Sequence, residues 1–254
     1  MAECKLCLKG RELRSSHIIP EFMYTAIYDA DPQRYYEIRM VNDEAKSRIE
    51  QKGKREKLLC QECESKLSVY EKYADENLYG KNINSEINLI NQSMTEDGKI
   101  FLYEFENCHY GKMKLFLDSL LWRLIVSNSF WTPKYDDTIT EKLRLSILNE
   151  TPLDECEFPC LIQSIMTGPG KILKGFILSP LDRTSVERQI LSVLIDGIDF
   201  NFIVSGAAPI DQINPYLNKR GELKIVGRLI YDMPELIQQI KKQMDHLKDR
   251  LNNN

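Results

Sequence analysis

The apolar positions in the later part of the chain follow a strand-like pattern. After about residue 157, short runs rich in β-branched and aromatic residues are separated by turn residues, which is typical of a sheet. With KIFLYEF (99–105) ahead of them, these runs predict an antiparallel or mixed sheet. The later runs are FPCLIQSIMT (158–167), KILKGFILS (171–179), RQILSVLIDG (188–197), DFNFIVSG (199–206) and LKIVGRLIY (223–231).

Two helices are predicted ahead of most of these strands. GKMKLFLDSLLWRLIVSNSFW (111–131) is apolar on most sides, as a buried helix is, and TITEKLRLSILNE (138–150) is amphipathic. Asp118 and Arg123 interrupt the first helix, so its apolar stretch is too short to span a membrane. We expect both helices to pack against the sheet.

The chain closes on a segment that predicts a helix over residues 233–252. Asp232 can cap it, and Pro234 lies in its first turn. Its apolar residues alternate in spacings of three and four, which is the seam of a short coiled coil. The stripe either packs on the chain's own sheet or joins two copies of the chain as a homodimer. Its members are Ile237, Ile240, Met244, Leu247 and Leu251.

The first 80 residues have a different character, because they contain two CxxC cysteine pairs. Strands are expected at residues 11–19 and 34–41, with short and long helices at 21–30 and 60–78. We therefore predict an α+β protein built from two parts. Residues 1–80 form a small zinc module, and residues 81–254 form an α+β domain with a mainly antiparallel sheet and the C-terminal helix.

Composition limits the partners and the compartment. With 43% hydrophobic and 28% charged residues in 254, the chain has the composition of a soluble globular protein. The net charge of −4 argues against general nucleic-acid coating, but it allows a local basic patch. The start MAECKLCLKG lacks the apolar core of a secretory signal, so we expect a cytoplasmic protein. Residues 45–57 supply the candidate patch: Lys46, Arg48, Lys52, Lys54, Arg55 and Lys57.

Four of the seven cysteines, Cys4, Cys7, Cys60 and Cys63, match the ligand set of a closed tetrahedral zinc site. The two-residue gap lets both sulfurs of a pair reach one ion. The second pair begins a helix, whose free N–H groups and dipole stabilise thiolates. A knuckle followed by a hairpin region and such a helix is the treble-clef arrangement. A redox-active CxxC is the rival interpretation, but it does not require two pairs.

The remaining cysteines, Cys108, Cys156 and Cys160, lie on or beside apolar segments and are predicted to be buried thiols. His17, in GRELRSSHIIP, is one of only three histidines. Four thiolates already close the zinc shell, so His17 is not expected to bind zinc. It is either a general base, a role that suits a neutral imidazole near pH 7, or a strand histidine bonded to backbone.

The combination of the first CxxC, SHIIP and LLCQECE resembles the HNH endonuclease pattern, in which a DHIIP-like strand is followed by an LCxxCH helix. The resemblance covers roughly residues 1–75. It implies a ββα-metal fold, structural zinc on the four paired cysteines, and His17 as the base that activates water. Glu64 stands where the last histidine binds a catalytic Mg²⁺ or Mn²⁺ ion. Ser16 stands where an acidic metal ligand is usual, and the expected asparagine or histidine before LLC is absent.

Three functions remain open from the sequence. The first is an HNH-like, metal-dependent endonuclease that hydrolyses phosphodiester bonds in DNA, or in RNA, with His17 and Glu64 as catalytic residues. By analogy, such an enzyme would suit defence against foreign DNA. The second is a non-catalytic zinc module that binds nucleic acid or protein, with Glu64 an ordinary carboxylate in the first turn of a helix. The third is an adaptor whose function lies in residues 81–254.

Overall fold

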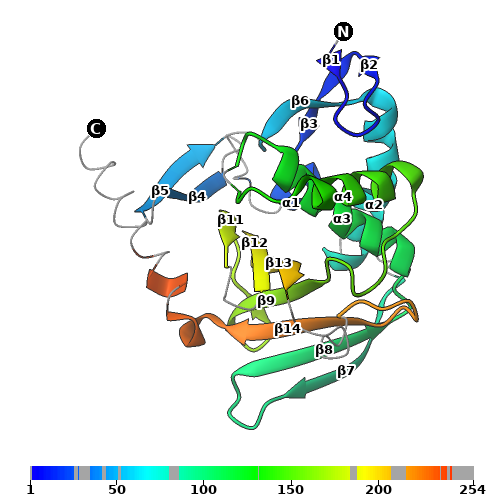
Figure 1. The fold of residues 1–254 in the computed structure, drawn as a ribbon. Coiled ribbons are helices and arrows are strands. Elements are labelled where there is room, and N and C mark those ends of the chain that lie inside the picture. The colour runs from blue at the N-terminus through cyan, green and yellow to red at the C-terminus, as the bar shows by residue number, and fades with distance from the viewer. Residues whose placement is uncertain are drawn as a thin grey trace, which may run out of the picture.

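The computed structural model describes residues 2–25, 28, 35–41, 44–50, 53–79, 86–130, 132–183, 188–206, 216–234, 236–238 and 241. One ten-stranded sheet dominates the fold (Figure 1). Its strands are β4 (Tyr35–Val41), β5 (Glu44–Glu50), β7 (Asn88–Met94), β8 (Ile100–Glu106), β9 (Cys160–Gly168), β10 (Lys171–Ile172), β11 (Phe176–Asp182), β12 (Arg188–Ile195), β13 (Ile198–Gly206) and β14 (Leu223–Leu229).

The strands run in the order β5-β4-β11-β12-β13-β9-β14-β8-β7, and β10 pairs with β9. Between described strands, β4 with β11 and β9 with β14 are parallel pairs. The other pairs of this sheet are antiparallel. The α+β class and the mainly antiparallel sheet are therefore confirmed.

The hairpin between β12 and β13 shows how local sequence sets the register. Asp196 and Gly197 both have positive φ, 49° and 82°, as a two-residue type I′ turn requires. A Cβ on Gly197 would lie 2.1 Å from the carbonyl oxygen of Leu173, so a side chain is excluded there. The turn pairs Ile195 with Ile198 and fixes the ladder that follows.

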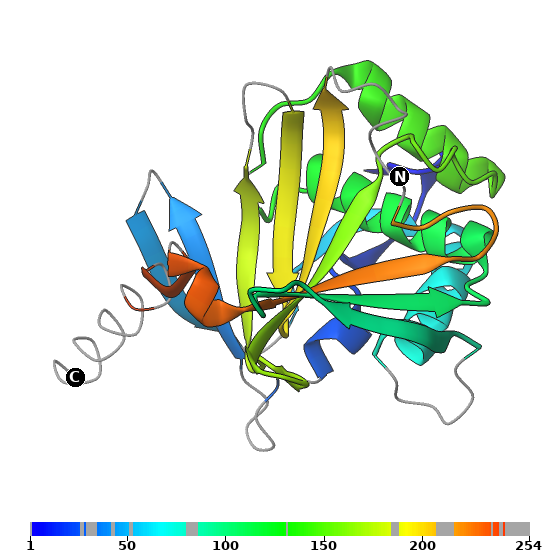
Figure 2. The same ribbon diagram turned by 90° about the horizontal axis from the view of Figure 1, so that it is seen from below.

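Helices cover one face of the sheet (Figures 1 and 2). They are α1 (Glu21–Thr25), α2 (Gln61–Leu78), α3 (Tyr110–Val126) and α4 (Asp137–Asn149), followed late in the chain by the 3₁₀ turn η2 (Ile230–Asp232). Helix α3 contacts both α2 and α4 and is buried along nearly its whole length, as predicted. The His109 side chain caps α3 by accepting a hydrogen bond from the Lys112 backbone N–H.

A continuous apolar core joins the early and late parts of the chain. It includes Leu6, Ile18 and Leu59 from the first 80 residues, Phe116 of α3 and Phe200 of β13. In addition, β4 and β5 extend the sheet by pairing with β11. The boundary between two domains after residue 80 stays a prediction. Strands β4 and β5, which come before that boundary, belong to the same sheet as the strands that follow it.

The opposite face of the sheet is partly covered by the segment after β14. Ile230 and Leu236 pack with Ile165, Leu178 and Leu194 in a second, smaller apolar cluster. Most of the predicted C-terminal helix, including four of its five seam positions, lies outside the described residues. Its first seam residue, Ile237, packs on this cluster of the chain's own sheet. Among the described helices, none is long and apolar enough to cross a membrane.

Candidate metal centre

The four paired cysteines converge at the N-terminal end of the molecule. Their sulfurs all lie within 4.8 Å of one another, and the Cys7 and Cys60 sulfurs are 3.9 Å apart. Zinc–sulfur bonds of about 2.3 Å in a tetrahedron separate the sulfurs by about 3.8 Å. The cluster therefore fits a metal ion such as zinc, bound by Cys4, Cys7, Cys60 and Cys63.

Local structure explains why each pair points inward. The first pair forms a turn between the antiparallel strands β1 (Ala2–Glu3) and β2 (Gly10–Arg11), where Leu8 takes a left-handed φ of 57°. Cys60 ends β6 (Arg55–Cys60) and is the N-cap of α2. Cys63 follows in the first turn of that helix, where unpaired N–H groups favour a thiolate.

The surroundings of the cluster already favour one thiolate. Burial alone raises the pKa of Cys4, but backbone hydrogen bonds from Cys7, Cys60 and Leu6 outweigh it and lower that pKa to about 7. One of these bonds, from the Cys60 N–H, is 3.3 Å long. Burial raises the pKa of Cys63. A bound cation supplies the charge that keeps such a buried thiol deprotonated.

A two-stranded ladder connects the cysteine cluster to His17. Strand β3 (Leu13–His17) pairs antiparallel with β6, placing His17 opposite Arg55 and Ser15 opposite Lys57. Strand β6 then runs directly into α2. Along the chain, α1, β4 and β5 lie between β3 and β6. Folding therefore brings together the candidate base at the end of β3 and the second cysteine pair at the start of α2.

The His17 ring is held by a carboxylate that the sequence analysis did not single out. His17 Nε2 lies 2.5 Å from Glu21 Oε2, and the ring is about one-fifth exposed. Glu21 also accepts a hydrogen bond from Tyr28 and lies 3.6 Å from Arg55. Desolvation lowers the pKa of His17, and Glu21 opposes that shift. The four-residue spacing of His17 and Glu21 across Pro20 was the only signal for this contact.

The positions that correspond to metal ligands in the resemblance, Ser16 and Glu64, are also neighbours. Burial raises the pKa of Glu64, and a hydrogen bond with Ser16 opposes it. Ser16 is buried, and its hydroxyl oxygen accepts the Leu59 N–H at 3.0 Å. Glu64 Oε1 is buried and has no hydrogen-bond partner among the described residues.

A fixed cation enters the same region from α3. The Arg123 guanidinium, 2% exposed, donates to Glu71 Oε1 at 2.7 Å and to the His17 carbonyl oxygen at 3.1 Å. Its charge also acts on Glu64. The signal for Arg123 was present in the sequence, as a charge inside an apolar helix, but nothing in the sequence indicated its partners.

These residues do not fit the divalent ion that the resemblance implies. Ser16 is a neutral ligand whose oxygen already accepts a backbone N–H, and the charge of a guanidinium that cannot lose its proton acts on Glu64. Within the described part of the chain, the four cysteines are the one group of three or more Cys, His, Asp or Glu residues whose ligand atoms converge. The described residues therefore support no catalytic step through Mg²⁺ or Mn²⁺.

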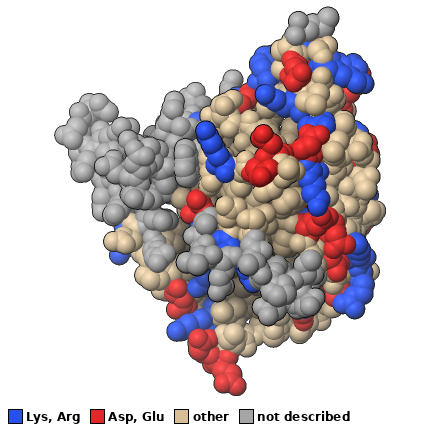
Figure 3. Space-filling view, in the orientation of Figure 1, with Lys and Arg blue, Asp and Glu red and all other residues tan. Residues whose placement is uncertain are grey.

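The candidate nucleic-acid residues are spread over two strands. Arg55 and Lys57 on β6 are exposed, and Lys54 just before them is half-buried. Lys46 and Arg48 lie on β5, and Lys52 lies outside the described residues. In Figure 3, basic side chains gather at the top of the molecule, where Figure 1 shows β1, β2 and β6, with acidic ones between them.

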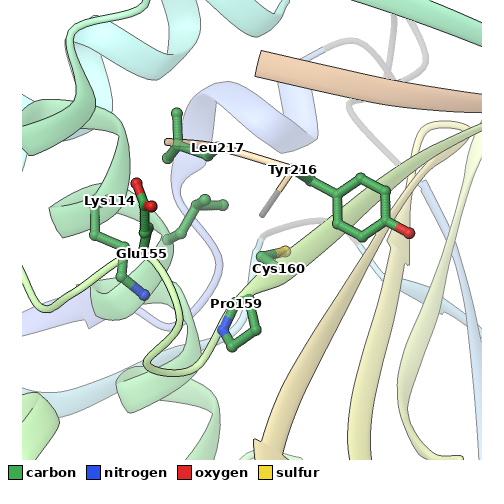
Figure 4. A pocket seen from close by; sticks show the side chains of 7 residues that line it. Lys114, Glu155, Pro159, Cys160, Tyr216 and Leu217 are labelled. Carbon is green, nitrogen blue, oxygen red and sulfur yellow. The ribbon is translucent and has the colours of Figure 1, made fainter. Parts of the chain in front are cut away.

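A small pocket lies elsewhere, between α3 and the start of β9 (Figure 4). Its volume of about 10 Å³ is close to the least that holds one water molecule. A pocket of this volume is too small for a substrate. The Tyr216 hydroxyl points away from Cys160 and Leu217 in Figure 4. The lining residues of the pocket are Lys114, Leu117, Glu155, Pro159, Cys160, Tyr216 and Leu217.

The three cysteines outside the cluster divide into two kinds. Cys108 and Cys160 are buried, as predicted, and burial raises the pKa of both thiols. Cys156 is partly exposed, because it lies in the loop before β9 rather than within the core. The prediction of a buried thiol is therefore wrong for Cys156.

The lowered pKa of His17 predicts a pH dependence of stability. Because the folded-state pKa lies below the ordinary value of 6.5, the unfolded chain takes up the proton first as the pH falls. The contribution of His17 is then present above pH 6.5 and lost as the pH falls through the folded-state pKa. We expect the difference in unfolding free energy between wild type and His17→Gln to shrink between pH 7.5 and 5, measured by urea denaturation.

The attraction between Glu21 and a protonated His17 ring acts in the opposite direction on the His17 pKa. If that attraction outweighed desolvation, wild type would gain stability relative to His17→Gln on acidification. That result, or parallel curves for the two proteins, contradicts the prediction.

Comparison of the chain with protein-family models, with curated proteins and with solved structures finds no match. Its class is therefore defined by the fold and the site: an α+β protein with a large, mainly antiparallel sheet and an N-terminal four-cysteine cluster suited to a metal such as zinc.

Proposed function

We propose that residues 2–79 contain a zinc-held treble-clef module of the HNH kind, which binds nucleic acid without hydrolysing it. The proposal rests on one observation, which is that two exposed cations share a face of the β3–β6 ladder with His17. Cross-strand neighbours share a face, so Arg55 and Lys57 lie beside His17 and Ser15. Both cations are exposed on β6, the strand that ends at Cys60 of the cysteine cluster, where they can contact phosphates.

The local charge balance supports a phosphate contact. His17 is shifted toward its neutral form, and Glu21 is shared between His17 and Arg55. Lys57 Nζ donates to the Leu13 carbonyl oxygen at 3.1 Å, which holds its stem along the ladder. Free thiolate ligands persist in a reducing compartment, so we propose that the protein acts in the cytoplasm.

Binding is tested by fluorescence anisotropy with the zinc-loaded full chain and labelled duplex DNA, single-stranded DNA and RNA. Replacing both Arg55 and Lys57 by alanine is expected to weaken binding to every sequence. It should also reduce the slope of log affinity against log salt by about two, one for each lost phosphate contact.

The matched control removes two other exposed cations, Lys134 and Lys171, which lie outside the module. We expect this double variant to bind like wild type. Absence of binding to all three nucleic acids at low salt, or equal loss in both double variants, refutes the proposal.

A second candidate, metal-dependent hydrolysis of phosphodiester bonds in DNA, is favoured by one contact. The 2.5 Å separation of His17 Nε2 and Glu21 Oε2 resembles the carboxylate–histidine pairs that orient a general base. Plasmid cleavage with Mg²⁺ or Mn²⁺ that is lost in His17→Ala would establish this candidate over the first. Equal cleavage by the two proteins would indicate a contaminating nuclease.

A further inference from the structure

Arg123 is a buried cation near His17, and each of its guanidinium nitrogens has a partner. Nε donates to the Ser119 carbonyl oxygen at 3.2 Å, and a second nitrogen lies 3.4 Å from the Ser119 hydroxyl. The third donates to both Glu71 and the His17 carbonyl oxygen. Arg123 thus ties α3 to α2 and to the end of β3.

Oxygen atoms that could bind a metal ion surround the Arg123 guanidinium. Glu71 lies two turns beyond Glu64 on α2, and the charge of Arg123 acts on both carboxylates. The end of β3 contributes the His17 carbonyl oxygen. The Glu71 carboxylate and the His17 carbonyl oxygen, both bound to Arg123, are hard oxygen donors of the kind that bind Mg²⁺ or Mn²⁺, and Glu64 feels the same positive charge.

A divalent ion and a guanidinium compete for such a set of oxygens. Arginine stays protonated in proteins, so the two cations repel each other strongly in an enclosed region of low dielectric. Arg123 is held by its own helix as well as by Glu71, and it cannot leave without breaking several hydrogen bonds. The guanidinium therefore has the advantage over an ion from solution.

We propose that Arg123 is the resident cation of this region and takes the place that the HNH resemblance gives to a divalent metal ion. Glu71 is then paired from within the chain, and the same charge acts on Glu64. The region binds no Mg²⁺ or Mn²⁺, and among the described residues only the cysteine cluster holds a metal. This inference is independent of nucleic-acid binding, since it concerns metal binding by the protein alone.

The test uses Mn²⁺, whose free concentration is measured by electron paramagnetic resonance, with the zinc-loaded full chain. Wild type is expected to show no stoichiometric Mn²⁺ site. Arg123→Gln, which removes the charge but keeps a hydrogen-bond donor, is expected to bind one Mn²⁺ at least tenfold more tightly than wild type. Adding Glu64→Gln to that variant should abolish the new site.

Arg123→Lys is the matched control, because it keeps a positive charge and is expected to exclude Mn²⁺ as wild type does. Circular dichroism of each variant checks that the helices are retained. One Mn²⁺ bound by wild type and lost in Glu64→Gln overturns the proposal, and this comparison does not depend on the folding of any Arg123 variant. A folded Arg123→Gln protein with no gain in Mn²⁺ affinity overturns it as well, because the guanidinium is then not what excludes the ion.

Discussion

Replacing Cys63 by serine is expected to remove bound zinc and to lower the melting temperature by roughly 10 °C or more, the effect of several kcal/mol in a chain of this size. Cys63 is 4% exposed and lies in the first turn of α2. Losing its sulfur opens the tetrahedral set and leaves three thiols without a cation, two of which, Cys4 and Cys60, are buried. The measurements are zinc content by atomic emission and thermal unfolding by circular dichroism.

The loss of stability should extend beyond the turn that holds Cys4 and Cys7, because the cysteine cluster is part of the main apolar core. Cys4, Cys60 and Cys63 belong to the same apolar cluster as the buried residues of α3. In addition, Arg144 of α4 donates to the Leu6 carbonyl oxygen at 2.6 Å, which fastens the knuckle to the helical layer. Loss of the metal therefore weakens contacts of α2 and α4 as well.

Cys156→Ser is the matched control, since this cysteine is partly exposed and outside the cluster. It should keep its zinc and change stability by no more than about 0.5 kcal/mol. Purified wild type without stoichiometric metal, or Cys63→Ser with full zinc content and an unchanged melting temperature, contradicts the prediction.

The second large effect is expected at a buried ion pair inside α3. Lys114 Nζ lies 2.9 Å from Asp118 Oδ1, and both side chains are less than one-twentieth exposed. Lys114 also donates to the carbonyl oxygens of Glu157 and Phe158. Asp118→Asn leaves the ammonium group without its counter-charge, which costs about 3–5 kcal/mol. Urea denaturation at pH 7.5 measures this loss.

The Lys114–Asp118 pair as a whole is expected to contribute little to the free energy of unfolding. A variant that replaces both residues tests this expectation. Burial raises the pKa of Asp118 to about 6 even though Lys114 pulls it down, so desolvation outweighs the attraction. Replacing the two residues together, Lys114→Met with Asp118→Leu, should recover most of the stability lost in Asp118→Asn. A double variant as unstable as the single one shows that the pair is worth more than its desolvation cost.

Features with local causes could be predicted from the sequence. The β-branched runs at 188–197 and 199–206 predict the strands β12 and β13, and the Asp196–Gly197 turn that joins them depends only on neighbouring residues. The buried character of α3 follows from its nearly continuous apolar residues. The convergence of the cysteine pairs was predicted over an intervening 52 residues, because four thiolates share one chemical use.

Features that depend on distant pairing could not be predicted. The parallel contact of β4 with β11 joins segments about 140 residues apart, and such pairing leaves no periodic signal in either strand. The partial exposure of Cys156 depends on how its loop lies over the core. Ser16 and Glu64 could be matched to metal-ligand positions, but their competing partners, Leu59 and Arg123, were not apparent.

By itself, the sequence determined the kind of elements this chain forms and the residues suited to a metal, because hydrophobic periodicity and CxxC spacing act over a few residues. Only the tertiary structure decided which charges share an enclosed space. Arg123 reaches His17 across 106 positions because α3 packs against α2 and the end of β3. That packing places a guanidinium against Glu71 and the end of β3, close enough for its charge to act on Glu64.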